Sequence, residues 1–416
     1  MKRLVFTLGL CLVATVCFGQ KKAVATASRL AKDAAPKFAE ARTSINEALQ
    51  HPETKDDAKT WYVAGLIESL QFDSENVKII MGQPQNDVLM YDALYAIYPY
   101  FLKAYELDML PDAKGKVKPK YVKDMRSILK VNIQNRYYVN GGAYYIEQQQ
   151  PPNYKKAFEL FDQFLEIADS RLIKEGMAKN ETQLVNDTLY AQISYYAAIC
   201  TEEGMDDATA MRAINRALKY DEFKNELYQL LVKRYLDAQD TVNYEKTLDE
   251  AVALFPNDLS FVTHLLKLYI DTERNEKALN YINIALKLDP SNAQYCHVAG
   301  SIYETGFKDL DKAEEYFKKA IEIDGEDAEL QASVGRVYFN RAVLRLDVAN
   351  ELNDIKKYSE ERDKAKDLFR QAMPYYEKAF RLNPDLPEPK MALRNIYYNL
   401  EIGDKLEEIE KYFKGE

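Results

Sequence analysis

The chain has 416 residues, of which 47% are hydrophobic and 29% are charged, so it has enough apolar surface to fold and is not disordered over most of its length. Glycine and proline number only 15 and 14, which argues against a turn-rich β-sandwich or β-barrel. The 56 Lys and Arg against 66 Asp and Glu give a net charge of -10, which argues against duplex nucleic acid or an anionic membrane as the main partner.

Residues 1–19 have the pattern of a signal peptide. A basic start precedes an apolar run at 4–16, which is too short to span a bilayer, and small residues follow it. We expect the mature chain to begin at Gln20 and to be exported, into the periplasm of a Gram-negative cell or otherwise into the medium. The run FGQKK resembles leaders of Gram-negative envelope proteins. Lipid attachment at Cys17 is an alternative, which is disfavoured because Val16 stands where a small residue is expected.

After the leader, residues 20–54 are expected to form an N-terminal helical segment, and 55–190 to form helix pairs that depart from a regular pattern. Insertions are expected at 71–90 and 111–120. The second insertion, PDAKGKVKPK, predicts a basic, solvated loop. The Gly141-Gly142 pair lies within a tyrosine-rich helical pattern, so we expect it to permit close packing between helices.

A two-helix pattern recurs over residues 191–327. The helix-ending segments begin at alanines, of which Ala217, Ala251 and Ala285 lie 34 residues apart, while Ala320 comes after a step of 35. A second apolar stripe with helical spacing precedes each of these segments. The pattern therefore predicts that each unit consists of two amphipathic helices. Because such a pair cannot bury its apolar faces alone, neighbouring units must stack.

Residues 328–386 are expected to form a further unit, lengthened by a projecting helical hairpin at 340–371. Residues 387–416 are expected to form capping helices. Pro99 and Pro374 stand in similar sequences, and we infer that each bends a long helix, because proline removes a backbone hydrogen bond. The alternative is that each proline lies in the first turn of its helix.

These units resemble the tetratricopeptide repeat, whose pattern is W-x2-L-G-x2-Y, then A-x3-F-x2-A, then P. The resemblance spans roughly 55–413, and its best units are 259–292 and 293–327. The matching residues there are Leu265, Tyr269, Ala278, Ile282, Ala285, Pro290, Ala299, Gly300, Tyr303, Ala313, Phe317 and Ala320. The resemblance implies an all-α fold, a right-handed α-solenoid of stacked antiparallel helix pairs.

In this family the first helix of each unit lines a concave groove that binds peptides. The positions just off the packing stripe are therefore candidate partner-binding residues, namely Tyr195, Gln229, Lys233, Thr263, Lys267, His297 and Arg336. Three of them are cations, which would hold an acidic segment or a C-terminal carboxylate of a partner through charge-assisted hydrogen bonds. The asparagine that the family uses beside such cations is missing here.

The sequence contains none of the motifs G-x-x-x-x-G-K-[ST], G-x-S-x-G, H-E-x-x-H and C-x-x-C. We therefore expect no catalytic residues, no cofactor and no metal, and we expect Cys200 and Cys296 to be buried apolar residues. The leading hypothesis is a non-catalytic, exported scaffold or adaptor for protein–protein interactions in the cell envelope. The alternative is a glycan- or polymer-binding envelope protein on similar helical repeats, with some of the 31 tyrosines stacking on sugars.

Overall fold

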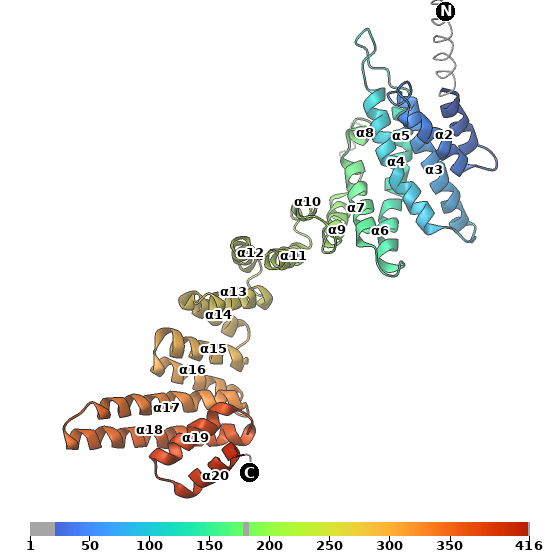
Figure 1. Ribbon diagram of the computed structural model, residues 1–416. Helices are drawn as coiled ribbons and strands as arrows, with labels where there is room; N and C mark the ends of the chain where they lie inside the picture. Colours follow the sequence, from blue (N-terminus) through green and yellow to red (C-terminus); the bar gives the residue numbers. More distant parts are fainter. Residues whose placement is uncertain (1–20, 178–182, 415–416) are drawn as a thin grey trace, which may run out of the picture. The chain divides into compact units, whose positions relative to one another are not determined.

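A computed structural model describes residues 21–177 and 183–414, and the regular secondary structure in these ranges is helical throughout, which confirms the expected all-α class (Figure 1). The predicted leader at 1–19 lies outside the described residues. Residues 21–31 are helical. They are followed by α2 Phe38–Gln50, α3 Ala58–Ile80, α4 Asp87–Asp108, α5 Val122–Gln134, α6 Tyr137–Glu147, α7 Tyr154–Asp169, α8 Arg171–Lys174, α9 Asp187–Ile199, α10 Asp207–Ala217, α11 Lys224–Asp237, α12 Thr241–Leu254, α13 Leu259–Asp271, α14 Asn275–Leu288, α15 Ala293–Ser301, the π-helix η1 Ile302–Phe307, α16 Leu310–Ile323, α17 Ala328–Asn350, α18 Ile355–Leu382, α19 Pro387–Asn399 and α20 Gly403–Lys414.

The chain divides into two compact units, Met1–Arg234 and Tyr235–Glu416. The division falls within α11, inside the stretch 191–327 that the sequence pattern treats as one array. None of the described helices is both long and apolar enough to cross a lipid bilayer.

In the first unit, helices pack as sequential pairs, α3 with α4, α6 with α7 and α9 with α10. Glycine residues permit the closest approach between the helices of a pair. A Cβ on Gly142 would lie 2.3 Å from Cε1 of Phe161, and one on Gly65 would lie 2.4 Å from Cδ1 of Phe101. The Gly141-Gly142 pair is thus a packing element, as its sequence pattern predicts, since a real Cβ cannot come so close to an aromatic ring.

The segment 71–90 differs from the expected insertion. Residues 71–80 continue α3 and α4 begins at Asp87, so that only a short turn separates the two helices. The buried carboxylate of Glu75 explains this continuity, because it accepts hydrogen bonds from Nζ of Lys78 at 2.8 Å and from the backbone N–H of Asn86 at 2.9 Å. The bond from Asn86, the N-cap of α4, joins the end of α3 to the start of α4.

Two long helices contain the prolines that the sequence singles out. Pro99 lies inside α4 and Pro374 inside α18, so the alternative that each proline begins its helix is wrong. Residues 111–120 contain no helix and are exposed throughout.

In the second unit the pairs are α13 with α14, α15 and η1 with α16, and α17 with α18, after which α19 packs on α18 and α20 on α19. Phe317, Phe369 and Tyr376 are fully buried in the core of its C-terminal part. Helices α17 and α18 have 23 and 28 residues and extend together as a long hairpin joined by residues 351–354.

Most helices begin at an Asp or Asn whose side chain accepts a hydrogen bond from a backbone N–H of the first turn. Such N-caps satisfy amide groups that the helix itself leaves unpaired. They are Asp57, Asn86, Asn153, Asn186, Asp206, Asp240, Asp258, Asn292, Asp309, Asp327 and Asp354. These residues account for the helix starts that the sequence pattern places only approximately.

Candidate functional site

The candidate site lies in the repeat at 293–327, where the first of the two helices ends differently from the first helices of the other repeats. In the second unit, a tyrosine carbonyl near the end of a first helix accepts a hydrogen bond from a backbone N–H just before the next helix. These pairs are Tyr235 with Asp240 at 2.9 Å, Tyr269 with Arg274 at 2.8 Å and Tyr397 with Ile402 at 2.9 Å. The residue before each of these N–H groups has a left-handed backbone conformation with positive φ. These residues are Gln239, Glu273 and Glu401. In the unit at 293–327 the equivalent bond joins Tyr303 to Asp309 at 2.9 Å, with Lys308 left-handed, so that this turn contains one more residue.

The π-helix η1 accommodates this extra residue. Helices α14 and α16 both have 14 residues, so the longer step from Ala285 to Ala320 does not come from the second helix. It comes from the end of the first helix, where residues 302–307 adopt the wider π-helical turn. Such single-turn widenings occur frequently at functional sites, because they redirect a side chain without ending the helix.

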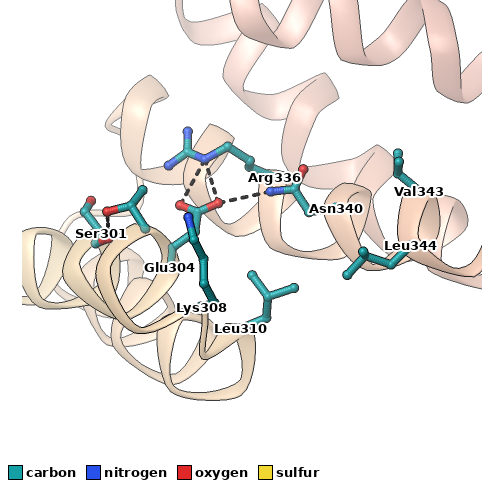
Figure 2. Close-up of a pocket in the computed structure, with 9 residues that line it drawn as sticks. Ser301, Glu304, Lys308, Leu310, Arg336, Asn340, Val343 and Leu344 are labelled. Atoms are coloured by element: carbon teal, nitrogen blue, oxygen red, sulfur yellow. Dashed lines mark hydrogen bonds and ion pairs between the residues drawn. The ribbon is translucent and has the colours of Figure 1, made fainter. Parts of the chain in front are cut away.

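Glu304 is the side chain that the widened turn buries. In two other repeats the residue that follows this tyrosine is exposed, by 50% at Leu236 and by 37% at Ile270. Glu304, which follows Tyr303, is only 8% exposed. Its two carboxylate oxygens each accept a hydrogen bond from Nε of Arg336 at 3.1 Å, and one of them accepts a bond from Nδ2 of Asn340 at 3.2 Å (Figure 2). The carboxylate is therefore buried but fully compensated.

Arg336 on α17 contacts a second carboxylate as well. One terminal guanidinium nitrogen donates to Oε2 of Glu388 at 2.8 Å, and the other donates to Oγ of Ser333 at 3.2 Å. Burial acts to lower the pKa of Arg336, but the hydrogen bonds and charges of the two carboxylates outweigh it and raise this pKa. Arg336 is thus a charged group that two acids of the chain already neutralise, and it is not the free groove cation that the sequence predicts.

His297 belongs to the same network. Its Nε2 lies 2.9 Å from Oγ of Ser333, which also contacts Arg336. Burial lowers the pKa of His297, and the positive charge of Arg336 lowers it further, which favours the neutral imidazole. Two of the predicted site residues are thereby brought together through Ser333.

A pocket of about 600 Å³ opens beside this network, between η1 and α17. Its lining residues are Ser301, Glu304, Thr305, Lys308, Leu310, Arg336, Asn340, Val343 and Leu344. Figure 2 shows Glu304, Arg336 and Asn340 joined on one side and Leu344 and Leu310 on another. Lys308 is exposed and has no ion pair among the described residues. The pocket therefore combines an internally neutralised polar wall, an apolar wall and one available cation.

The other predicted residues of the second unit lie elsewhere. Thr263 and Lys267 are exposed on α13 and do not line the pocket. The hydroxyl of Thr263 donates to the backbone carbonyl of Leu259 at 2.8 Å, so it is used within its own helix.

The first unit contains the remaining three predicted residues, each in contact with a neighbour. The ring of Tyr195 stacks on that of Phe223 with centroids 4.4 Å apart. Gln229 donates a hydrogen bond to Asn225 at 2.7 Å. Lys233 forms an ion pair with Glu202 at 2.5 Å.

Sequence reasoning missed Glu304, Lys308 and Asn340. The signal that points to the first two is the step of 35 residues between Ala285 and Ala320, which marks one extra residue but not its position. Elsewhere in the described ranges, Cys200 and Cys296 are buried free thiols, and no group of His, Cys, Asp and Glu is arranged to hold a metal ion.

Comparisons with known proteins find a match for two of the repeated units. A family model of the tetratricopeptide repeat matches residues 260–292 and 293–327. Similar solved structures include a MamA protein (20% identity, 47% of this chain and 93% of that chain, TM-score 0.34). They also include residues 41 to the end of MamA from Desulfovibrio magneticus RS-1 (17%, 44% and 96%, 0.30), and YrrB, titled a TPR protein with an unusual peptide-binding site (19%, 47% and 91%, 0.32). No curated protein sequence matches the chain.

Proposed function

We propose that this chain, in which residues 260–327 are tetratricopeptide repeats, is a non-catalytic scaffold that holds a segment of a partner protein in the pocket between η1 and α17. Repeats of this kind present continuous helical surfaces whose usual task is recognition of peptides or subunits. The observation that carries the proposal is the one-residue widening of the repeat at 302–307, which departs from its neighbours where the pocket opens.

The lining favours a particular kind of segment. Leu310, Val343 and Leu344 offer an apolar wall, while Glu304 and Arg336 neutralise each other. Lys308 is then the cation left for a ligand. The pocket fits an extended segment in which a bulky apolar side chain stands next to an acidic side chain or a terminal carboxylate, because apolar burial and one charge-assisted hydrogen bond are then both satisfied.

Site-specific photo-crosslinking tests this proposal in cells that make the protein. A photoreactive amino acid at Leu344 lies in the pocket, whereas one at Val242 is exposed on α12 and serves as the matched control. We expect Leu344 to yield a discrete crosslinked peptide from one partner and Val242 to yield none. The same products from both positions, or no discrete product from Leu344, would contradict the proposal.

The glycan-binding alternative is less well supported by this site. Sugar rings are held by stacking on exposed aromatic faces. The lining of the pocket between η1 and α17 includes no aromatic residue. Large tyrosines such as Tyr138, Tyr145 and Tyr269 are buried in the core.

Export to the cell envelope is part of the proposal and rests on residues 1–19 of the sequence. The apolar run at 4–16 after a basic start supports it. Cell fractionation with mass analysis of the isolated protein tests it. We expect the protein in the envelope fraction with Gln20 as its first residue. A chain that retains 1–19, or one with lipid on Cys17, would contradict this expectation.

A further inference from the structure

A basic loop in the first unit is independent of the proposed pocket. It joins α4 to α5, extends beyond the helix ends in Figure 1, and its residues 110–120 are all exposed. It contains four lysines, Lys114, Lys116, Lys118 and Lys120. Lys118 pairs with Asp112 at 3.2 Å, while the other three have no ion pair among the described residues.

Two acidic residues hold the loop in shape, Asp112 within it and Asp108 at the end of α4. Oδ1 of Asp112 accepts hydrogen bonds from the backbone N–H groups of Lys114 and Lys116, each at 2.9 Å. Oδ2 of Asp108 accepts from the backbone N–H groups of Lys120 and Tyr121, each at 2.7 Å. Since these carboxylates bind backbone amides, the loop is ordered before any ligand arrives, and binding then costs little conformational entropy.

Two apolar side chains accompany the lysines. Leu110 is 61% exposed and Val117 is 45% exposed. Leu110 precedes the turn, and Val117 lies between Lys116 and Lys118. Exposed apolar side chains set among several lysines are typical of segments that bind at the interface of an anionic membrane.

We propose that the loop at 110–120 docks the chain on an anionic lipid surface. The lysine ammonium groups contact lipid phosphates, and Leu110 and Val117 enter the interfacial layer. The net charge of -10 does not prevent this, because salt screens charges beyond about 8–10 Å and the loop presents four lysines beside two acids, Asp108 and Asp112. An acidic polypeptide is the competing ligand, and apolar exposure beside the lysines favours lipid.

Co-sedimentation with vesicles tests the proposal on the protein purified from its own cells. The vesicles contain phosphatidylcholine alone or phosphatidylcholine with an equal amount of phosphatidylglycerol. We expect binding to the mixed vesicles only. The triple variant Lys114→Gln, Lys116→Gln and Lys120→Gln is expected to bind them about a hundredfold more weakly, because each lysine near an anionic surface contributes roughly a fivefold factor.

A dispersed triple variant is the matched charge control. Lys32, Lys155 and Lys219 are exposed lysines of the same unit without ion pairs among the described residues. Their change to Gln removes the same charge and is expected to leave vesicle binding unchanged. Equal losses in the two triple variants would mean that only net charge matters, which would overturn the proposal.

The apolar contribution has its own control. Leu110→Ser with Val117→Ser is expected to weaken binding, whereas Ile80→Ser with Met81→Ser is not. Ile80 and Met81 are exposed where α3 ends, a short turn before α4 begins, and the 22 residues of α4 span roughly 33 Å between that turn and the basic loop. Loss of vesicle binding in the second pair alone would contradict the proposal. So would a lysine variant that binds vesicles normally but no longer binds soluble poly-glutamate, since the loop would then serve an acidic polypeptide.

Discussion

Arg336 on α17 places its Nε 3.1 Å from both carboxylate oxygens of Glu304, a residue 32 positions earlier in the chain. The contact joins the widened turn of one repeat to the first helix of the next. The repeat pattern places Arg336 in the groove as a cation for a ligand. The contact shows that its guanidinium is instead paired with a carboxylate of the protein. It also fixes one wall of the proposed binding pocket.

Removal of Arg336 should leave a buried, uncompensated charge. Arg336→Met keeps much of the side-chain volume but strips Glu304 of its main donor. We expect unfolding of the full chain in urea to show a loss of about 2–3 kcal/mol, because breaking one partner of a buried ion pair is costly. Lys319→Met is the control, since its partner Glu315 is exposed, and a change below about 1 kcal/mol is expected there. Equal losses in the two variants would show that the Arg336 pair is no more than a surface contact.

A partly buried carboxylate of the same unit, that of Glu314, predicts a pH dependence. Burial acts to raise the pKa of Glu314, but hydrogen bonds from Lys318, Tyr338 and Arg341 outweigh it and lower this pKa to about 2. Since the folded pKa lies below the unfolded value, the ionised carboxylate stabilises the fold above about pH 4.5, and this contribution is lost as the pH falls toward 2.

Glu314→Gln tests this assignment. We expect the variant to be less stable at pH 7, by about 1–2 kcal/mol once solvent screening is allowed for. It should also lose less stability than the unmodified chain between pH 5 and pH 2, as measured by urea unfolding at each pH. Parallel stability curves for the two proteins would show that Glu314 does not carry the dependence.

Glycine at the helix contacts should not tolerate a methyl group. A Cβ on Gly300 would lie 2.5 Å from Cδ1 of Phe317, so Gly300→Ala must displace a fully buried ring. We expect a loss of about 1–3 kcal/mol, as for other overpacked cores. Gly403→Ala is the control, because nothing lies within 4 Å of that position at the start of α20, and it should be neutral or slightly stabilising. A neutral Gly300→Ala would mean that the helices separate without cost.

The cations predicted for the groove provide a test of how far binding extends. Lys267 is exposed on α13, and Lys233 pairs with Glu202 near the surface. Neither lysine lines the pocket between η1 and α17, so we expect the double variant Lys233→Glu and Lys267→Glu to keep partner binding, helix content by circular dichroism and the melting temperature. Loss of the partner from this variant in pull-down would show that the binding surface extends beyond the pocket.

The core of the fold follows from local sequence patterns, whereas the candidate site does not. Tyr303, Gly300 and Phe317 can be placed from their spacing, because each helix must present one apolar stripe to its neighbour. The partners of Arg336 cannot, since Glu304 and Glu388 lie 32 and 52 residues away along the chain. The one-residue difference between repeats is visible in the sequence, but its position depends on where the backbone widens. The continuation of α3 through 71–80 was missed for a similar reason, because the buried bonds of Glu75 stabilise it.

The most direct test of the proposed pocket is deletion of Thr305, which restores the 34-residue step and should convert η1 into an ordinary helical end. The probe is a synthetic peptide of the segment crosslinked from Leu344, and its affinity is measured by titration calorimetry. We expect the deletion variant to keep the helix content of the full chain and to bind this peptide at least about tenfold more weakly, a difference of about 1.4 kcal/mol. Equal affinity in the two proteins would show that the widened turn does not form the binding site.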